Sequence, residues 1–381
     1  MMKYFTLLLV FMMNLDAKTI CLNMIVKNES KAIERCLNSC KDIIDYWVIV
    51  DTGSTDGTQD LIRKVMADKP GELHERPWVD FSHNRNEALE LAKPKADYIL
   101  FIDADEHLVF KNKFKKNQLT KPYYFSIVQE PKVRSKRAFL IDTVHDWKWI
   151  GVVHETIYCE GLPLDPDECF DNLIKISNTT DGFRSRDPDK YLKDAQLLEN
   201  ALIQYPGNPR YTFYLAQSYM NANQHLLALK NYEKRAGMGA SEEERWFSSY
   251  MVARLHEAMG FPSEVVTQEY CKAFQERNYR AEPLGYLAHH HLSKGNYILA
   301  YVLAEQALQM KMPSDIVFVE DWFYDYGFLA IYADAALRLG LKAKALDAYK
   351  KVLGKEVPLA IRNKVESDVA NLESEKQLQP R

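Results

Sequence analysis

The chain has 381 residues, of which 47% are hydrophobic and 27% charged, and its formal net charge at pH 7 is -4. This length is sufficient for two globular domains, and the composition is ordinary for a folded protein. A net negative charge argues against nucleic acid as a partner held by bulk electrostatics.

The first 17 residues have the pattern of a secretory leader. Lys3 is followed by about ten apolar residues, and the segment ends at the small residue Ala17, which is the order of charge, apolar core and cleavage site in a signal peptide. The apolar core is too short to span a bilayer comfortably. We therefore expect residues 1–17 to direct the protein into the secretory route or to anchor it peripherally on a membrane. The alternative is an early first strand in a cytoplasmic protein.

Residues 18–180 alternate strand-like and helix-like segments. Buried strands are predicted at Thr19–Val26, Tyr46–Val50, Glu72–Arg76 and Tyr98–Ile102. Helices are predicted from a Ser30 cap to about Lys41, from residue 58 to about Ala67, and at Asn84–Ala92 after Ser82. Such alternation gives right-handed βαβ units and a mostly parallel sheet, so the domain is predicted to be α/β. Strand-like segments follow at Tyr123–Gln129, Val133–Ile141 and Gly151–Tyr158, two of them expected as a hairpin beside the site.

From residue 181 to about residue 375 the alternation stops and helical hairpins are predicted. Small and aromatic residues recur with a spacing of roughly 34 residues, which is the tetratricopeptide pattern. Small residues let paired helices approach closely, and aromatic residues fill the gap between hairpins. A degenerate copy surrounds Ala253, and the clearer copies contain Leu215, Ala216, Tyr219, Ala228 and Tyr232, then Leu287, Ala288, Ala300 and Ala304, then Ala333, Ala345 and Tyr349. An all-α repeat domain is therefore expected.

Six cysteines are present without a Cys-x-x-Cys pair or a zinc-ligand spacing. Cys36 and Cys40 are one helical turn apart, and the other four are scattered. We expect all six to be small buried hydrophobic residues.

Carboxylates directly follow the fourth predicted strand. Asp103, Asp105 and Glu106 come immediately after the apolar run that ends at Ile102. Parallel sheets bind their ligands at the carboxyl ends of the strands. Two carboxylates at this spacing suit a hard divalent cation that also takes phosphate oxygens. The alternative for the same pattern is a turn or a helix cap.

Four motifs of the first half occur together. They are Asn23-Met-Ile-Val-Lys-Asn-Glu29, Asp51-Thr-Gly-Ser-Thr-Asp-Gly-Thr58, Phe81-Ser-His-Asn-Arg-Asn-Glu87 and Phe101-Ile-Asp-Ala-Asp-Glu106. In this order they resemble the nucleotide-sugar half of the family 2 glycosyltransferases, which have a GT-A fold. The resemblance covers about residues 18 to 110 and extends more weakly to about residue 180. The fused repeats also resemble a branch of the family that includes peptide-modifying members.

The resemblance implies a nucleotide-sugar donor, preferably a UDP-sugar, and a Mn²⁺ or Mg²⁺ ion. It makes Asp105 a direct metal ligand, places Asp103 nearer the ribose or a metal-bound water, and assigns Asp51 to the pyrimidine base. His154 is implied as a further metal ligand, with a buried structural histidine as the alternative. The other implied donor contacts are Asn23, Lys27, Asn28, Glu29, Gly53, Ser54, Arg85, Asn86 and Ala104. A plain turn at Gly53 and a solvated helix N-terminus at Arg85 remain alternatives.

Glycosyl transfer releases a diphosphate and builds positive charge on the sugar, so it needs a cation for the leaving group and a base on the acceptor. Glu155, Asp146 and Glu106 are the candidates for the base. The Glu-Asp pair of many inverting members has no counterpart here, which leaves the base and the stereochemical course open, with inversion as our expectation. The Gln-x-x-Arg-Trp motif of processive synthases is also absent from this region, so we expect transfer of a single hexosyl or N-acetylhexosaminyl group.

The repeats are expected to hold the acceptor, a peptide, protein or glycan, or to bind a protein partner. The competing hypothesis is a protein-binding scaffold whose transferase domain is inactive. A phosphotransferase that uses Asp103 and Asp105 is less compatible with the sequence, because that chemistry places its pair after the first strand of the domain. The presence of Asp51, Asp103, Asp105 and His154 favours an active transferase.

Overall fold

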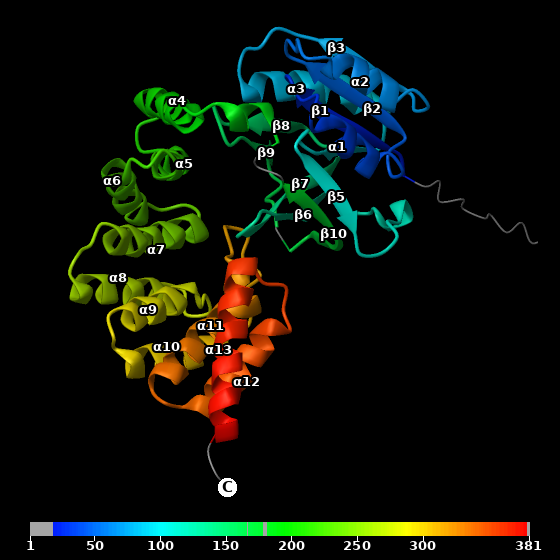
Figure 1. The fold of residues 1–381 in the computed structure, drawn as a ribbon. Coiled ribbons are helices and arrows are strands. Elements are labelled where there is room, and N and C mark those ends of the chain that lie inside the picture. Colours follow the sequence, from blue (N-terminus) through cyan, green and yellow to red (C-terminus); the bar gives the residue numbers. More distant parts are fainter. Residues whose placement is uncertain (1–17, 166, 178–180, 379–381) are drawn as a thin grey trace, which may run out of the picture.

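The structure is a computed structural model that describes residues 18–165, 167–177 and 181–378. The predicted leader, residues 1–17, and the last three residues lie outside the described residues. In Figure 1 an α/β domain, coloured blue to green, is followed by helices from green to red that form a curved array beside it. The sequence-based prediction of an α/β half followed by an all-α half is confirmed.

The first domain is built on an eight-stranded sheet with the strand order β3-β2-β1-β4-β7-β6-β10-β5. Strands β3, β2, β1 and β4 are parallel, and β7 pairs with β4 in the antiparallel direction. Their bounds are β1 Ile20–Val26, β2 Tyr46–Asp51, β3 Gly71–Glu75, β4 Tyr98–Phe101, β5 Glu106–Phe110, β6 Tyr123–Gln129, β7 Arg134–Asp142 and β10 Cys169–Ser177.

Helices cover both faces of the parallel part of this sheet. Leu22 of β1 packs with helices α1 (Ile33–Cys40) and α2 (Thr58–Val65) on one face. The adjacent residue Cys21 faces the other side of the sheet, where it packs with α3 (Phe81–Ala92). Burial on both sides explains why β1, β2 and β4 are apolar along nearly their whole length. Parallel pairing places the carboxyl ends of β1, β2 and β4 at one edge of the sheet.

Several local predictions need correction. Helix α1 begins after Ala32 without a side-chain cap, and Asp80, rather than Ser82, caps α3 by accepting from the backbone of His83. The predicted strand Gly151–Tyr158 is a turn at residues 151–155 followed by β9 (Thr156–Cys159), which pairs with β8 (Trp147–Ile150). Strands β5, β8 and β10 were not predicted, because their alternation is weak. Cys271 is exposed and Cys169 is half-buried, whereas Cys21, Cys36, Cys40 and Cys159 are buried as expected.

The second domain consists of successive antiparallel helical hairpins. Its helices are α4 Lys190–Gln204, α5 Pro209–Asn221, α6 His225–Ala236, α7 Glu242–Ala258, α8 Ser263–Glu276, α9 Glu282–Ser293, α10 Tyr297–Leu308, α11 Phe328–Arg338, α12 Lys342–Leu353 and α13 Leu359–Leu378, with a π-helical turn at Phe323–Gly327. The predicted repeat positions Ala216, Ala228, Ala288, Ala300, Ala304, Ala333 and Ala345 are fully buried. Close helix–helix packing therefore explains the small residues.

Among the described residues, no helix is both long enough and apolar enough to cross a bilayer.

Residues 311–320, called the strap below, leave the repeats and return to the first domain. Val319 forms a two-way backbone pair with Arg134 of β7, at 2.8 and 2.9 Å. The backbone nitrogen of Lys136 donates to the carbonyl of Ile316 at 3.3 Å. The strap is therefore one connection that fixes the repeats against the sheet.

Candidate functional site

The loops that follow β1 and β2 are joined by hydrogen bonds into one wall at the carboxyl edge of the sheet. Asn28 donates its backbone nitrogen to Ser54 Oγ at 2.8 Å, and its own Oδ1 accepts from the backbone of Thr55 at 2.8 Å. The backbone nitrogen of Glu29 donates to Thr58 Oγ1 at 2.8 Å. Asn28 adopts a left-handed backbone with φ 56°, which asparagine tolerates better than most residues. The predicted donor-contact residues of both motifs thus lie together.

Asp51 is fully buried at the end of β2. Its Oδ1 accepts from the backbone nitrogens of Gly53 and Ser54 at 2.9 and 2.8 Å, and from Gln59 Nε2 at 3.1 Å. Gly53 has φ 104°, a conformation that favours glycine. Oδ2 is buried and has no hydrogen-bond partner among the described residues. Leaving such an acceptor unpaired is costly, and a ring N–H of a pyrimidine base would satisfy it.

Glu106 fixes the turn that carries the two aspartates. It is buried, and its Oε2 accepts from the backbone nitrogen of Asp103 at 3.1 Å. Lys175 Nζ lies 3.3 Å from the same oxygen, and Arg137 Nη1 lies 3.4 Å from Oε1. This carboxylate is fully engaged inside the domain. The prediction of Glu106 as a base that meets an acceptor is therefore corrected to a structural role.

Arg85 of α3 bridges Asp103 and Glu155. Its Nη2 donates to Asp103 Oδ1 at 2.8 Å, and its Nε donates to Glu155 Oε1. The guanidinium also lies over the ring of Trp149, 5.1 Å from the ring centre. Burial acts to raise the pKa of Asp103, but the charge and hydrogen bond of Arg85 outweigh it and lower that pKa to about 2. Asp103 is ionised at neutral pH.

Asp105 is the carboxylate of this turn whose charge is not compensated. It forms no ion pair with another described residue, although its backbone carbonyl accepts from Arg35 Nη2 at 3.2 Å. Burial, and then the negative charges of Asp103 and Glu106, raise the pKa of Asp105 to about 6. Two neighbouring carboxylates with surplus negative charge are a donor set that fits Mg²⁺ or Mn²⁺.

His154 lies in the turn between β8 and β9, with a left-handed backbone at φ 54°. Its ring stacks on Tyr214 of α5, with the centroids 4.2 Å apart and an interplanar angle of 11°. His154 is exposed to solvent; partial desolvation of its ring by its neighbours, and then the positive charges of Arg210 and Arg137, lower the pKa of His154 below its ordinary value. In the part of the chain that the structure describes, no group of three or more His, Cys, Asp or Glu side chains is arranged to hold a metal. The predicted set of Asp103, Asp105 and His154 is therefore not assembled here, because the ring packs against Tyr214.

A short segment before α4 forms a roof over the acidic turn. The backbone nitrogen of Phe183 donates to Glu29 Oε1 at 3.1 Å, and Asp181 pairs with Arg35 at 2.6 Å. A Cβ atom at Gly182 would lie 2.8 Å from Asp105 Oδ2, so a side chain at this position would displace that carboxylate. Burial, and then the charge of Asp105, raise the pKa of Glu29 to about 7. No motif in the sequence indicated this roof.

Comparison with known proteins agrees with this geometry. Residues 21–113 match the family model described as glycosyl transferase family 2. Over these residues the N-terminal domain is similar to this family. The match covers β1 to β5, so it includes the wall, Asp51 and the acidic turn of the transferase domain.

Several curated proteins similar to this chain are described as glycosyltransferases. The prophage-derived glycosyltransferase SunS of Bacillus subtilis is 30% identical over 212 residues, which are 53% of this chain and 49% of that protein. An uncharacterised glycosyltransferase of Rickettsia bellii is 37% identical over 97 residues, 26% of this chain and 31% of that protein. The chain thus spans about half the length of SunS and about a third of the length of the Rickettsia protein. The solved C-terminal part of a TPR repeat-containing protein of Cytophaga hutchinsonii superposes with a TM-score of 0.41 at 15% identity. The match covers 50% of this chain and 69% of the solved chain.

Three predicted residues of the transferase domain lie away from the donor wall or are already engaged. Asn23 is buried inside the sheet, where its Nδ2 donates to the carbonyl of Ala88 at 2.8 Å. Asn86 Nδ2 donates to the backbone carbonyl of Trp149 at 2.9 Å, and Asn86 Oδ1 accepts from the backbone nitrogen of Trp149 at 2.7 Å. Asp146 is exposed and pairs with Lys148 at 2.9 Å. The roles predicted for these three are corrected to structural ones for Asn23 and Asn86 and to a surface ion pair for Asp146.

Two more predicted contacts remain compatible with the donor site. Ala104 is buried within the acidic turn, and Lys27 is exposed at the end of β1 next to the wall. The structure thus brings together Lys27, Asn28, Glu29, Asp51, Gly53, Ser54, Arg85, Asp103, Ala104, Asp105 and Glu155 at one edge of the sheet.

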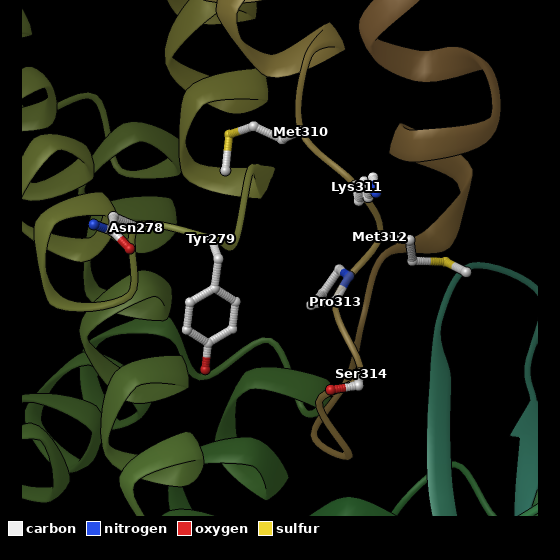
Figure 2. A pocket seen from close by; sticks show the side chains of 7 residues that line it. All are labelled: Asn278, Tyr279, Met310, Lys311, Met312, Pro313 and Ser314. Carbon is white, nitrogen blue, oxygen red and sulfur yellow. The ribbon is translucent and has the colours of Figure 1, made fainter.

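Two open cavities of the repeat domain lie elsewhere. One, of about 450 Å³, is lined by Tyr279 and by Met310, Lys311, Met312 and their neighbours, and Figure 2 shows it between the turn after α8 and the start of the strap. The other, of about 580 Å³, surrounds Ile298 at the start of α10. Neither is lined by a residue of the donor wall or of the acidic turn. The carboxylate chemistry therefore locates the candidate site, and cavity size does not.

Proposed function

We propose that the protein transfers one sugar from a UDP-sugar to an acceptor with the help of Mn²⁺ or Mg²⁺. One observation carries this proposal. Two carboxylates occur at the same edge of a sheet similar to that of the family 2 transferases: Asp51, whose Oδ2 has no hydrogen-bond partner among the described residues, and Asp105, whose charge is not compensated. The first suits a pyrimidine base, and the second suits the cation that accompanies a diphosphate.

The residues have separate roles in this proposal. Asp51 and the wall at Asn28 orient the nucleotide. Asp103 and Asp105 hold the cation, which when bound neutralises charge on the departing diphosphate. Arg85 keeps Asp103 ionised and fixes its direction through the 2.8 Å hydrogen bond. The neutral ring of His154 borders the site from the turn after β8, and its part as a metal ligand would need a rotation away from Tyr214.

Glu155 is our candidate for the base. Asp146 lies on the surface and Glu106 is locked inside the domain, whereas Glu155 is linked to Asp103 through Arg85 alone. Its ion pair with Arg85 must loosen when the acceptor binds, because a paired carboxylate is a weak base. We propose inversion and transfer of a hexosyl or N-acetylhexosaminyl group.

We further propose that the repeats contact the acceptor, a peptide, protein or glycan, or bind a protein partner. Hairpin repeats form extended surfaces suited to such ligands. The N-terminal segment supports a location on the secretory route or at a membrane surface, with the cytoplasm as the alternative.

The test is calorimetry of UDP and of a panel of UDP-sugars, with and without Mn²⁺, on wild type, Asp105→Ala and the surface control Asp146→Ala. We expect binding that requires the metal, falls by on the order of 100-fold in Asp105→Ala, and is unchanged in Asp146→Ala. If the folded wild-type protein binds no nucleotide under any of these conditions, the enzyme hypothesis fails and a protein-binding scaffold with an inactive transferase domain replaces it.

A further inference from the structure

The turn between β8 and β9 includes a backbone conformation that one of its residues does not favour. Gly151 has φ 115°, which glycine adopts readily, whereas His154 has φ 54°, which is uncommon for a residue with a side chain. Hydrogen bonds within the hairpin end at Ile150 and Thr156. The conformation of residues 151–155 therefore depends on contacts from outside the hairpin.

Helix α5 of the repeat domain supplies several of these contacts. Arg210 Nη2 donates to the carbonyl oxygen of His154 at 2.9 Å, and Tyr214 stacks on the His154 ring. The Arg210 guanidinium lies over the Tyr214 ring at 4.8 Å and pairs with Glu244 of α7 at 3.3 Å. The neighbouring Val153 is only 4% exposed and packs in the hydrophobic core of the repeats.

The same turn continues directly into the candidate active site. Glu155 follows His154 and binds Arg85, which binds Asp103 at 2.8 Å. A continuous series of contacts therefore runs from α5 through the turn to the metal-binding carboxylates. Displacing the turn by a fraction of an ångström would shift Glu155 and weaken its ion pair with Arg85.

We propose that Arg210 and Tyr214 are positioning residues for the transferase reaction, so that the first helical hairpins complete the active site as well as carrying a binding surface. This inference rests on the proposed function. Neither residue is among those that we propose to hold the donor. They act by holding the main chain and ring of His154, and through them Glu155 and Arg85. The nucleotide wall at Asn28 and Asp51 makes no contact with either residue, so donor binding and turnover should respond differently.

The test compares Arg210→Ala, Arg210→Lys and Tyr214→Ala in the full chain. The control is Arg245→Ala, because Arg245 has 36% side-chain exposure against 35% for Arg210 and forms a comparable ion pair with Glu276 on the same repeats. The probes are UDP and UDP-glucose with Mn²⁺, and the readouts are UDP affinity, the rate of UDP release from UDP-glucose, and hydrogen exchange in residues 147–159.

We expect Arg210→Ala and Tyr214→Ala to lower the rate of UDP release by on the order of 100-fold while UDP affinity changes by less than about threefold. Exchange in residues 147–159 should rise in these two variants alone, and Arg210→Lys should recover part of the rate because lysine can still donate to the carbonyl. Unchanged exchange in this turn would overturn the inference, whether or not the protein hydrolyses UDP-glucose. Equal loss in Arg245→Ala would also overturn it. Absence of UDP binding by wild type would instead count against the proposed function.

Discussion

At the scale of single residues, opposite effects on neighbouring carboxylates organise the site. Arg85 lowers the pKa of Asp103 to about 2, whereas Asp105 and Glu29 have no such partner, and burial with like charge raises their pKa values to about 6 and about 7. Separation of pKa values within one cluster is typical of functional sites. This separation supports the proposal that a cation binds at the carboxylate of Asp105.

Glu29 gives a pH-dependent prediction for stability. Its pKa is about 7 in the folded state against an ordinary value of 4.5, so between these values the folded state binds more protons than the unfolded state. The stability of the wild type relative to Glu29→Gln should accordingly fall as pH rises from about 4.5 to about 7 and level off above that, by a total on the order of 2 kcal/mol. Glutamine can still accept from the Phe183 nitrogen.

Thermal unfolding of both proteins at a series of pH values measures this difference. The matched control is Glu34→Gln, since Glu34 is exposed on α1 and should show no such trend. A constant gap between wild type and Glu29→Gln across the series would contradict the prediction.

At the scale of elements, the strap is the segment whose conformation depends most on side chains. It has little regular structure, yet Asp315 pairs with Arg277 at 2.8 Å and Arg280 at 3.0 Å, and Glu243 accepts from the backbone of Ile316 and Val317 at 2.9 and 2.8 Å. Arg280 is fully buried. These groups hold the strap where Val319 can pair with β7.

We predict that Asp315→Ala lowers the free energy of unfolding by about 1–3 kcal/mol, because it removes hydrogen bonds to Arg277 and to the buried Arg280, which keeps its ion pair with Glu282. The control is Asp325→Ala, which removes an exposed ion pair with Lys355 at 3.0 Å and should change stability by less than about 1 kcal/mol. Urea titrations followed by circular dichroism would measure both. Equal midpoints for the two variants would show that the strap is not held by this network.

At the scale of the whole molecule, the two domains share structural elements. Val153 belongs to the transferase domain by sequence but is buried in the repeat core, and the strap belongs to the repeats but pairs with β7. The repeats therefore contact the sheet domain at two separated places, through α5 and through the strap. Such contacts make the stability of the two domains interdependent.

The boundary predicted at residue 180 can be tested by expressing residues 18–180 alone. We expect this fragment to melt at a lower temperature than the full chain, or to aggregate, because Val152 and Val153 become exposed and the contacts of Arg210 and Val319 are lost. Circular dichroism melting and light scattering would measure this. A fragment that melts as cooperatively and as high as the full chain would show that the domains are energetically independent.

Local sequence was sufficient for much of this structure. Apolar runs ending in polar motifs predicted β1, β2 and β4 and the parallel sheet, because a strand buried on both faces must be apolar throughout. The same runs placed Asp51, Asp103 and Asp105 at one edge, and the recurrence of small residues predicted the helical hairpins. These features depend on chemistry within a few residues or on a regular spacing, both of which are visible in one sequence.

Contacts between distant residues were decided only by the tertiary structure. The backbone of Phe183 reaches Glu29 across 154 residues, and Arg210 reaches His154 across 56. No local sequence pattern predicts either contact, because each depends on how the two domains pack against each other. The amide of Asn86 shows the same limit: its motif predicted a donor contact, but packing of α3 against β8 directs it to Trp149. The sequence by itself determined which residue types meet at the sheet edge, and tertiary contacts, most of them within the first domain, decided which of them remain free for a ligand.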